Sequence, residues 1–527
     1  MHIDSAPASI PVDTGHHDCD VLVVGGGING VGIARDLAGR GWRVVLAERD
    51  DLASHTSSAS TKLIHGGLRY LEHRQFGLVR KALQERELLL RSAPHIMRSM
   101  RFVMPHDPGM RPAWLIRLGL FLYDHLARRE WLQGSSGIRL DGTPLGAPLQ
   151  ERFERGFVYS DGWVDDARLV VLAAVDAAER GAVIHTRTPC IRVQRARLGW
   201  HALLQHGNGD TQAVHARALV NAAGPWAEEF LRDVARSPDG QALPARGLRI
   251  VRGSHIVVPR CFDHDHAYIF QAPDRRIVFA IPYEEHFTLI GTTDVETATP
   301  ARRCEPDADE IRYLCEQASR CLRQPVLPRQ VIWSFAGMRP LLADEAGAAS
   351  EITRDYLLEA DDAAGAPLLS VWGGKITTFR KLAEEAADRV GHMLGEARPA
   401  WTAGAGLPGS DLSPWIGRAS TPQLDIRRFI AELRRAHPWL EPRLATRLAR
   451  AYGSRVHGIL GAARQASDLG RQVAPSLYEA ELHHLCTSEW ARTAEDVLWR
   501  RSKLGLHLDI NQRQAVERWM LRRQEVA

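Results

Sequence analysis

The sequence predicts an α/β fold of the Rossmann-like, dinucleotide-binding type, joined to an antiparallel β region and an all-α C-terminal domain. Three observations predict it. A strand, a glycine-rich turn, a helix and a second strand follow one another within residues 20–50. Alternating and β-branched segments recur between about residues 247 and 331, as in half-buried antiparallel strands. Helical patterns then succeed one another through residues 424–527 without a strand signal.

The glycine motif indicates a dinucleotide site because each part of it has a physical role. The apolar run Val21–Val24 fits a buried parallel strand, and Gly25, Gly27 and Gly30 follow as G-x-G-x-x-G. These glycines permit a tight turn, a close approach of the backbone to a pyrophosphate, and close packing of helix on strand. Glu48 ends the second strand, where a carboxylate that binds the ribose hydroxyls is expected. A ligand-free turn is the alternative, and the matching context disfavours it.

Bulk properties exclude several classes of protein. The 527 residues carry a net charge of only +4, which is too small a bias for a nucleic-acid binder but suits an anionic substrate or membrane surface. The seven cysteines are scattered without a C-x-x-C spacing. We therefore expect a reducing compartment and no metal site. The N-terminal residues lack a signal-peptide pattern, and no run of about 18 apolar residues predicts a membrane-spanning helix.

A loop rich in hydroxyl residues follows the second strand. Ser57, Ser58, Ser60 and Thr61 offer hydrogen-bond donors to phosphate or ring oxygens. The glycines of His65-Gly66-Gly67 would let a flat ring lie close to the backbone. The alternative is a serine-rich surface loop, and the apolar residues at the far end of the segment disfavour it.

Two motifs carry a family resemblance. GGGINGVGIARDLAGRG at 25–41 and SSASTKLIHGGLRYLEH at 57–73 resemble the opening of the FAD-dependent, quinone-linked glycerol-3-phosphate dehydrogenases, and further motifs extend the resemblance to about residues 18–525. It implies a two-dinucleotide-binding-domain flavoprotein with FAD as cofactor. The implied reaction oxidises sn-glycerol 3-phosphate at C2 to dihydroxyacetone phosphate, with hydride passing to flavin N5 and electrons to a membrane quinone.

The resemblance also implies a homodimer in the cytoplasm, attached peripherally to the inner face of the membrane and in contact with its anionic surface. The alternatives are a glycerol-3-phosphate oxidase that uses O₂, an FAD-dependent 2-hydroxy acid or amino acid oxidoreductase, and a flavin-binding scaffold without turnover. The expected FAD contacts are Gly25, Gly27, Asn29, Gly30, Glu48, Ser57, Ser58, Ser60, Thr61, Lys62, His65, Gly66, Gly67, Ala223, Gly224, Gly374, Lys375, Ile376 and Thr377.

Arginines supply the candidate phosphate site. Arg339 and Arg354 lie beside apolar or aromatic neighbours, and a guanidinium in such surroundings needs an anionic partner such as a phosphate dianion. Internal ion pairs with nearby acids, such as Asp344 or Asp355, are the alternative. In the resembling family the corresponding arginines line the substrate pocket, and Arg69 and Tyr70 are expected beside them.

The candidate general base is His255, which lies within a strand pattern, GSHIVVP. A lone histidine there is more often a satisfied core residue, but the motif matches the family and an imidazole needs little tuning to act as a base. Lys375 is the second candidate, at the start of a helix whose N-terminus would face the flavin. Arg339 is expected to polarise the reacting oxygen or to hold the phosphate.

Two local features leave alternatives open. Asp165 and Asp166 precede a helix, and we favour helix capping over general-base or metal-ligand roles. Residues 110–129 form an apolar helix with interspersed arginines, which is either buried or interfacial at a lipid surface. The sequence alone favours a buried helix. The family resemblance makes an interfacial helix almost equally favoured.

The predicted domains follow from these patterns. They are a disordered tail at 1–18; an oxidoreductase domain at 19–397, with FAD-binding parts at about 19–92, 157–246 and 332–397 and a substrate β region at about 247–331; a linker at 398–423; and a helical C-terminal domain at 424–527.

Overall fold

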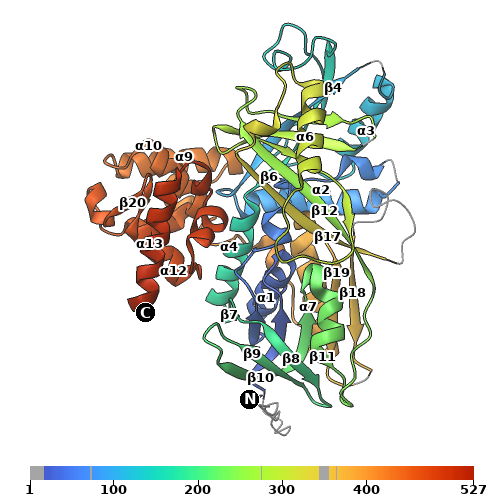
Figure 1. Ribbon diagram of the computed structural model, residues 1–527, viewed down its shortest axis with the longest axis vertical. Coiled ribbons are helices and arrows are strands. Elements are labelled where there is room, and N and C mark those ends of the chain that lie inside the picture. Colours follow the sequence, from blue (N-terminus) through green and yellow to red (C-terminus); the bar gives the residue numbers. More distant parts are fainter. Residues whose placement is uncertain are drawn as a thin grey trace.

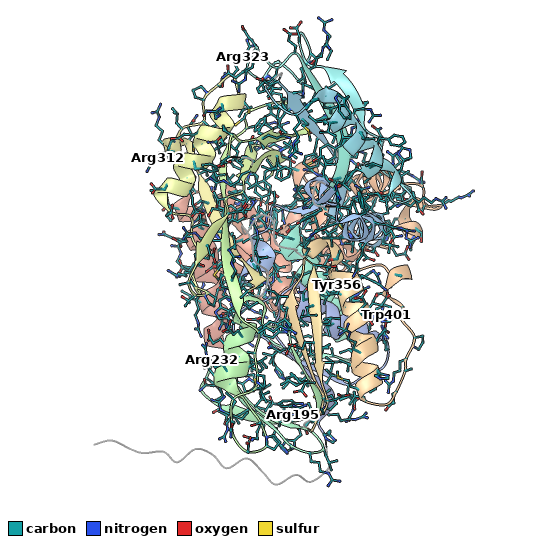
Figure 2. The ribbon with its side chains drawn as sticks, turned by 90° about the vertical axis from the view of Figure 1, so that its right-hand side faces the viewer. Arg195, Arg232, Arg312, Arg323, Tyr356 and Trp401 are labelled. Atoms are coloured by element: carbon teal, nitrogen blue, oxygen red, sulfur yellow. The ribbon has the colours of Figure 1, made fainter. Side chains whose placement is uncertain are left out.

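The computed structural model describes residues 17–71, 74–107, 109–274, 276–343, 355–363 and 365–526. The predicted N-terminal tail falls almost wholly outside this range. Figure 1 shows two units side by side: an elongated body, and a smaller helical domain formed by the end of the chain. Figure 2 shows the body from the side, with Arg195 in its lower, dinucleotide-binding half and Arg312 and Arg323 in its upper half.

The lower half is organised by a mixed sheet with the order β11-β8-β9-β10-β1-β2-β7, in which β10 also pairs with β19 and β19 with β18. Its strands are β1 Cys19–Val24, β2 Val44–Ala47, β7 Val183–His185, β8 Cys190–Arg195, β9 Trp200–Gln205, β10 Thr211–Asn221, β11 Ala235–Arg236, β18 Tyr356–Asp361 and β19 Leu368–Gly373. The central strands β7, β2, β1, β10 and β19 are parallel. The predicted Rossmann-like core is therefore confirmed.

Helices cover this sheet. They are α1 Ile28–Gly39, α4 Asp166–Glu179, α5 Ala227–Glu229 and α7 Phe379–Met393, whereas α2 Phe76–Ser92 packs against strands of the upper half. Helix α1 packs against α4 and α7 and is buried along most of its length. Val21 and Val23 of β1 share one core cluster with apolar residues of α1, α4 and α7, and Leu22 and Val24 belong to a second cluster. This burial fixes the glycine turn between β1 and α1, where the site begins.

The upper half holds a second sheet with the order β16-β12-β15-β14-β13-β4-β6-β3, to which β17 and β5 are attached. Its strands are β3 Leu63–Ile64, β4 Met97–His106, β5 Ser136–Arg139, β6 Arg155–Val164, β12 Leu248–Pro259, β13 Ala267–Gln271, β14 Ile277–Tyr283, β15 Phe287–Gly291, β16 Val295–Thr297 and β17 Trp333–Leu342, with α6 Ala308–Cys321 packed on them. The predicted antiparallel β region is confirmed, apart from the parallel pairing of β13 with β4.

The helical domain contains α8 Ser413–Ile416, α9 Pro422–Ala436, α10 Pro442–Tyr452, α11 Val456–Leu460, α12 Glu479–Ser488 and α13 Ile510–Val526. It also contains a small hairpin, β20 Gln472–Ala474 and β21 Leu477–Tyr478. The predicted helical C-terminal domain is therefore confirmed, apart from this hairpin, whose strands of two and three residues are too short to show alternation in the sequence. In the lower sheet, Arg187 lies between β7 and β8 and has a φ of +53°.

The exposure of helix α3, Ala113–His125, decides whether the apolar segment at 110–129 is buried. Of its residues only Leu120, Tyr123 and Asp124 are buried, while the side chains of Trp114 and Phe121 are 68% and 48% exposed. The interpretation of this segment as a buried helix is therefore wrong. Among the described residues, no helix combines the length and the apolar character that crossing a membrane requires.

Candidate active site

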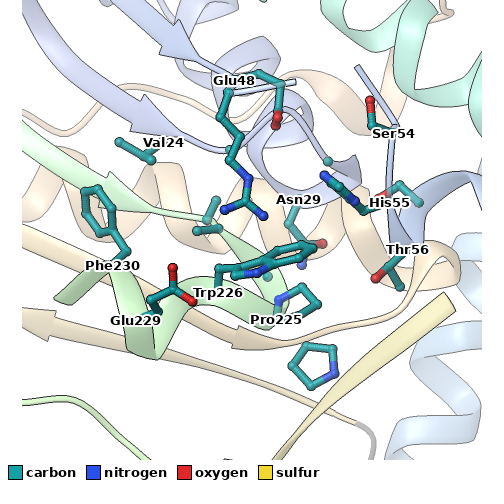
Figure 3. A pocket seen from close by; sticks show the side chains of 18 of the residues that line it. Val24, Asn29, Glu48, Ser54, His55, Thr56, Pro225, Trp226, Glu229 and Phe230 are labelled. Atoms are coloured by element: carbon teal, nitrogen blue, oxygen red, sulfur yellow. The ribbon is translucent and has the colours of Figure 1, made fainter. Parts of the chain in front are cut away.

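A cavity of about 410 Å³ opens where β1, β10 and β19 end beside the N-terminus of α1 (Figure 3). The glycine turn makes this space. Gly25 has a φ of +113°, and a Cβ on it would lie 2.4 Å from the Ala222 carbonyl oxygen. A Cβ on Gly30 would lie 1.9 Å from the Gly25 carbonyl oxygen. Both positions therefore exclude any side chain, as the glycine motif predicts.

Glu48 lies at one end of the cavity, pointing into it from the end of β2 (Figure 3). Its carboxylate accepts hydrogen bonds from the Gly26 N–H at 2.6 Å and the Asp50 N–H at 2.7 Å. Burial raises its pKa, while these two N–H groups favour the charged form. The two donors fix the carboxylate, and the second lone pair of each oxygen remains suited to a ribose hydroxyl.

The phosphate-binding position lies at the start of α1. Gly27 is the N-cap residue, and the first turn of α1 contains no acidic side chain, so the helix dipole favours an anion there. The Ile28 N–H donates to the Ser57 hydroxyl oxygen at 2.9 Å, which leaves the Ser57 proton available to a phosphate. The Ser58 hydroxyl instead donates to the His55 carbonyl within its own turn.

Several residues that line this cavity were not predicted from the sequence, among them Arg49, His55, Trp226 and Phe230. Arg49 lies 4.1 Å over the Trp226 ring, and the His55 ring centroid lies 4.6 Å from that of Trp226. These groups, together with Phe230, line the cavity beside Glu48 and offer flat, partly apolar surfaces to an adenine ring. The sequence offered only weak indications that these residues line the cavity. Arg49 directly follows Glu48, and Trp226 follows the small residues after β10.

The other end of the cavity is formed by Ala223, Gly224 and the turn after β19. Asn29 donates from Nδ2 to the Gly373 carbonyl at 3.1 Å, and its Oδ1 is buried without a hydrogen bond to any described residue. A Cβ on Gly374 would lie 2.8 Å from Asn29 Nδ2. The close approach of α1 to this turn thus leaves one acceptor aimed at a ligand.

The hydroxyl-rich loop connects this end to the upper sheet. The His65 N–H donates to Thr377 Oγ1 at 3.3 Å, and Ile376 begins the helical turn that contains Thr377. The Lys375 ammonium lies 3.8 Å over the Tyr70 ring. The sequence-predicted residues around Lys375 and Tyr70 are therefore brought together.

The Gly66 N–H and the Gly67 backbone shape the middle of the same loop. Gly66 donates to the Tyr123 hydroxyl at 2.8 Å. Gly67 has a φ of +74°, and a Cβ on it would lie 2.3 Å from the Tyr70 ring. Gly67 is thus required for the position of Tyr70, and Gly66 for the close approach of Tyr123, whose ring would lie 2.8 Å from a Cβ there.

His255 lies on β12 and is 1% exposed. Its Nε2 is hydrogen-bonded to Thr61 Oγ1 at 2.9 Å, and its ring stacks on Phe335 at 4.9 Å. Burial lowers its pKa well below the usual value, and the charges of Arg339 and Lys62 add to the effect. The imidazole is therefore neutral near pH 7, which is the form that accepts a proton.

Arg339 extends from β17 toward the same region. Its guanidinium forms an ion pair with Asp294 and donates to Thr292 Oγ1 at 2.9 Å. The side chain keeps 24% exposure, so it is accessible to a ligand. A Cβ on Gly253 would lie 2.3 Å from Arg339 Nη2, so this glycine makes room for the guanidinium.

The remaining predicted residues differ in their placement. The Lys62 ammonium and the Ser60 hydroxyl both donate to Asp166, each at 2.7 Å, so these two side chains are engaged with α4. Asp165 accepts from the Arg168 N–H and caps α4 as predicted. Arg354 and the side chain of Arg69 lie outside the described residues.

Comparison with known proteins agrees with this geometry. Residues 20–380 match the model of a family described as FAD dependent oxidoreductase, and residues 346–520 match that of the C-terminal domain of alpha-glycerophosphate oxidase. A glycerol-3-phosphate dehydrogenase of Pseudomonas aeruginosa is 51% identical, over 94% of this chain and 93% of its own. D-erythritol 1-phosphate dehydrogenase of Brucella abortus is 46% identical, over 95% of this chain and 97% of its own.

A solved structure is similar over nearly the whole chain. The glycerol-3-phosphate dehydrogenase of Bacillus halodurans, complexed with FAD, superposes with a TM-score of 0.74 at 28% identity and covers 96% of this chain and 90% of its own. Fold and cavity together define a flavoenzyme of the FAD-dependent oxidoreductases. Within that class, the chain belongs to the family of the glycerol-3-phosphate dehydrogenases.

The residues present fit FAD, the cofactor of this family. Glu48 suits the adenosine ribose, the start of α1 suits the pyrophosphate, and Asn29, whose buried Oδ1 has no hydrogen bond to a described residue, lines the cavity beside Gly374. The cofactor prediction is thus confirmed at the level of the family. The individual contacts, Ile376 and Thr377 among them, stay predictions.

Proposed function

We propose that the chain oxidises sn-glycerol 3-phosphate at C2 to dihydroxyacetone phosphate and passes the electrons to a membrane quinone. One observation carries the proposal. A neutral, buried imidazole and a guanidinium lie on neighbouring strands, and the Thr61 loop joins the imidazole to the wall of the flavin cavity. The 51% identity to a glycerol-3-phosphate dehydrogenase over nearly the full length supports the choice of substrate.

In this reaction His255 removes the proton of the C2 hydroxyl. The bound FAD supplies a hydride acceptor at N5. Thr61 holds His255 Nε2, and the buried Nδ1 has no partner among the described residues, so the ring is oriented through one nitrogen. Because the pKa of His255 is low, the neutral base persists from alkaline pH down to well below pH 6.5.

Arg339 holds the phosphate, or polarises the C2 oxygen, through its forked N–H groups. Its existing ion pair with Asp294 keeps the guanidinium in place before the substrate arrives. Lys375, stacked over Tyr70, is the alternative base or a second phosphate ligand. Tyr70 then orients the substrate at the edge of the flavin.

Quinone reduction requires contact with a membrane, and α3 is the proposed contact. It exposes Trp114, Leu118 and Phe121, and Arg117 and Arg128 lie on and just after it. Apolar side chains that enter the acyl region with arginines at the headgroups are typical of interfacial helices. We further propose a peripheral location on the cytoplasmic face and a homodimer, both of which rest on the family resemblance.

A second candidate substrate is D-erythritol 1-phosphate, because a dehydrogenase of that name is 46% identical over 95% of this chain. Both molecules are phosphate monoesters of a polyol. They differ by one hydroxymethylene unit, so discrimination depends on the room that the substrate site leaves for this unit. Comparison of kcat/KM for the two substrates decides between them.

The test of the phosphate role is Arg339→Lys. Loss of the forked, charged hydrogen bonds is expected to cost about 1.5–3 kcal/mol, or roughly 10- to 150-fold in KM for glycerol 3-phosphate. The flavin absorbance is expected to be retained. The matched control is Arg312→Lys on α6, whose side chain is 58% exposed. An unchanged KM in Arg339→Lys would remove this residue from the substrate site.

A further inference from the structure

A second cavity, of about 440 Å³, lies between the body and the helical domain and shares no residue with the flavin cavity. The body contributes β4, the end of β6 and the turn between β14 and β15. The helical domain contributes α10 and the segment before α13. The basic side chains that line it are Arg98, Arg168, Arg260, Arg443, Arg447, Arg450, Arg501 and Lys503.

Five of these eight cations already have anionic partners among the described residues, and one of them is Arg260, which pairs with Asp265. Arg168 pairs with Glu489, Arg447 with Glu481, and Lys503 with Asp165. Arg501 pairs with Asp51. These pairs fix the walls of the cavity, and they leave no charge to be neutralised by a ligand.

Arg98 differs from them. It lies on β4 with its guanidinium 4.7 Å over the Trp163 ring. Its Nε is buried without a hydrogen bond, and none of the ion pairs among the described residues includes it. Burial and the nearby charge of Arg450 lower its pKa to about 10. A guanidinium held beside another cation, without a carboxylate in ion-pair contact, favours an anion from solution.

Arg450 faces the same space from α10. Burial lowers its pKa, and the charge of Arg427 adds to the effect. No ion pair in the described part of the chain includes Arg450. Two unpaired guanidinium groups, one from each unit of the molecule, thus face one cavity.

Four acidic residues, Asp165, Asp265, Glu284 and Glu285, also line the cavity. The charges of Glu284 and Asp265 act on Arg98, and those of Glu284 and Glu285 on Arg450, but only through space and less strongly than burial and the neighbouring cations. Glu284 and Glu285 lie on the β14–β15 turn, and no ion pair within the described ranges joins either of them to Arg98 or Arg450. Burial raises the pKa of Glu284 to about 7, so near neutral pH its carboxyl group is partly uncharged. A protonated carboxyl group can itself donate to an anion.

His95 adds an unsatisfied group. It is 1% exposed and lines the cavity, and neither of its ring nitrogens has a hydrogen-bond partner among the described residues. Buried polar atoms are ordinarily paired. The imidazole N–H of His95 thus adds a further donor without an acceptor to the wall of the same cavity.

We propose that this cavity is a second anion site, which binds a small phosphate-bearing molecule between Arg98 and Arg450. A phosphate dianion matches two guanidinium forks and accepts from several donors at once. The ligand bridges β4 of the body and α10 of the helical domain, so its binding also strengthens the contact between the two units.

The test is calorimetric titration of the full-length holoenzyme with inorganic phosphate at pH 8 and constant ionic strength. The variant Arg98→Gln/Arg450→Gln is expected to bind at least about tenfold more weakly than the wild type at this site, a change of about 1.4 kcal/mol. Phosphate in the substrate site contributes equally to both proteins, so the difference isolates the second cavity. Arg434→Gln, on the exposed face of α9, is the control and is expected to match the wild type.

A second variant keeps the test decisive if the double variant is poorly folded. Glu284→Gln removes a negative charge from the cavity and is expected to tighten phosphate binding by about threefold or more at pH 8. Misfolding cannot produce such a gain. Identical titrations for wild type, Glu284→Gln and the double variant would overturn the proposal, as would an equal loss in Arg434→Gln.

The same titration with glycerol 2-phosphate identifies the source of the phosphate group. A monoester that binds at least about tenfold more tightly than inorganic phosphate assigns the cavity to phosphorylated metabolites. Equal or weaker binding assigns it to free phosphate.

Discussion

The flavin cavity and the joint between the body and the helical domain are built by opposite means. The flavin cavity is shaped by backbone: glycines without side chains, the N-terminus of α1 and the ends of parallel strands. The joint is shaped by charged side chains that are buried in pairs, such as Arg168 with Glu489 and Arg501 with Asp51.

This difference explains how each region responds to change. A site shaped by backbone loses its ligand-binding geometry when a side-chain atom is added, because the rigid neighbouring backbone cannot move away. A buried ion-pair site fails when one partner is removed, because the other charge is then left without compensation. The predictions below probe the two regions in order of decreasing effect.

The largest effect is expected from Gly30→Ala. The new Cβ would lie 1.9 Å from the Gly25 carbonyl oxygen, so the turn that receives the pyrophosphate must open. We expect purified protein without bound FAD. Gly119→Ala on α3 is the matched control, since nothing lies within 4 Å of its Cβ. Flavin absorbance measures both, and full FAD occupancy in Gly30→Ala would contradict the account of the turn.

Substitution of the base comes next. His255→Gln is expected to lower kcat by about 10²- to 10⁴-fold while FAD stays bound. The wild-type pH profile provides a second check. Because burial depresses the pKa of His255, kcat/KM is expected to stay level as the pH falls through 6.5 and to decline only below it. A wild-type decline centred near pH 6.5, or a normal kcat in His255→Gln, would transfer the role to Lys375.

The joint is tested by Glu489→Gln, which leaves the buried guanidinium of Arg168 without its carboxylate. We expect a loss of about 3–5 kcal/mol in the free energy of unfolding of the helical domain, measured by urea denaturation. The pKa of Glu489 is lowered to about 2. The pair's stabilisation is therefore complete above about pH 4.5 and is lost as the pH falls toward 2.

The matched substitution is Glu432→Gln on α9, whose partner Arg435 is 76% exposed. Surface pairs contribute less than about 1 kcal/mol, so little change is expected there. Equal losses in the two variants would mean that burial does not distinguish the joint from the surface.

This difference between a backbone site and a site of paired side chains also explains why the sequence predicts the flavin cavity but not the joint. The flavin cavity was predictable because its residues recur at fixed local spacing: Gly25, Gly27, Gly30 and Glu48 lie within one strand–helix–strand unit. The hydroxyl-rich loop was also recognisable from its local composition as a candidate cofactor contact. That Ser60 and Lys62 instead donate to Asp166, 106 and 104 positions away along the chain, is visible only in the structure.

The joint was not predictable because its partners are far apart along the chain. Asp51 and Arg501 are separated by 450 positions, and Arg168 and Glu489 by 321. An arginine-rich helix is usually a solvated surface, and nothing in the pattern of α10 distinguishes Arg450 from its neighbours. The exposure of α3 was undecided for a similar reason, since an apolar helix is equally compatible with a core and with a lipid surface.

The smallest effect is expected at α3, where Trp114→Ser removes one exposed apolar side chain. We expect the partition onto anionic vesicles to weaken by about 1–2 kcal/mol, or roughly tenfold, with unchanged turnover of a soluble quinone analogue. Leu198→Ser is the control, because Leu198 is 58% exposed on a turn of the lower sheet far from α3 along the chain. Vesicle sedimentation measures both, and equal losses would remove α3 from the membrane contact.

The central claim is that glycerol 3-phosphate reduces a flavin held at the glycine turn. The most direct test is the absorption spectrum of the purified protein under anaerobic conditions, before and after addition of sn-glycerol 3-phosphate. The account predicts oxidised-flavin bands that bleach promptly and return on addition of a soluble quinone analogue rather than of air. Flavin bands that persist with substrate would contradict the proposed reaction, and a folded protein that takes up no FAD would contradict the site itself.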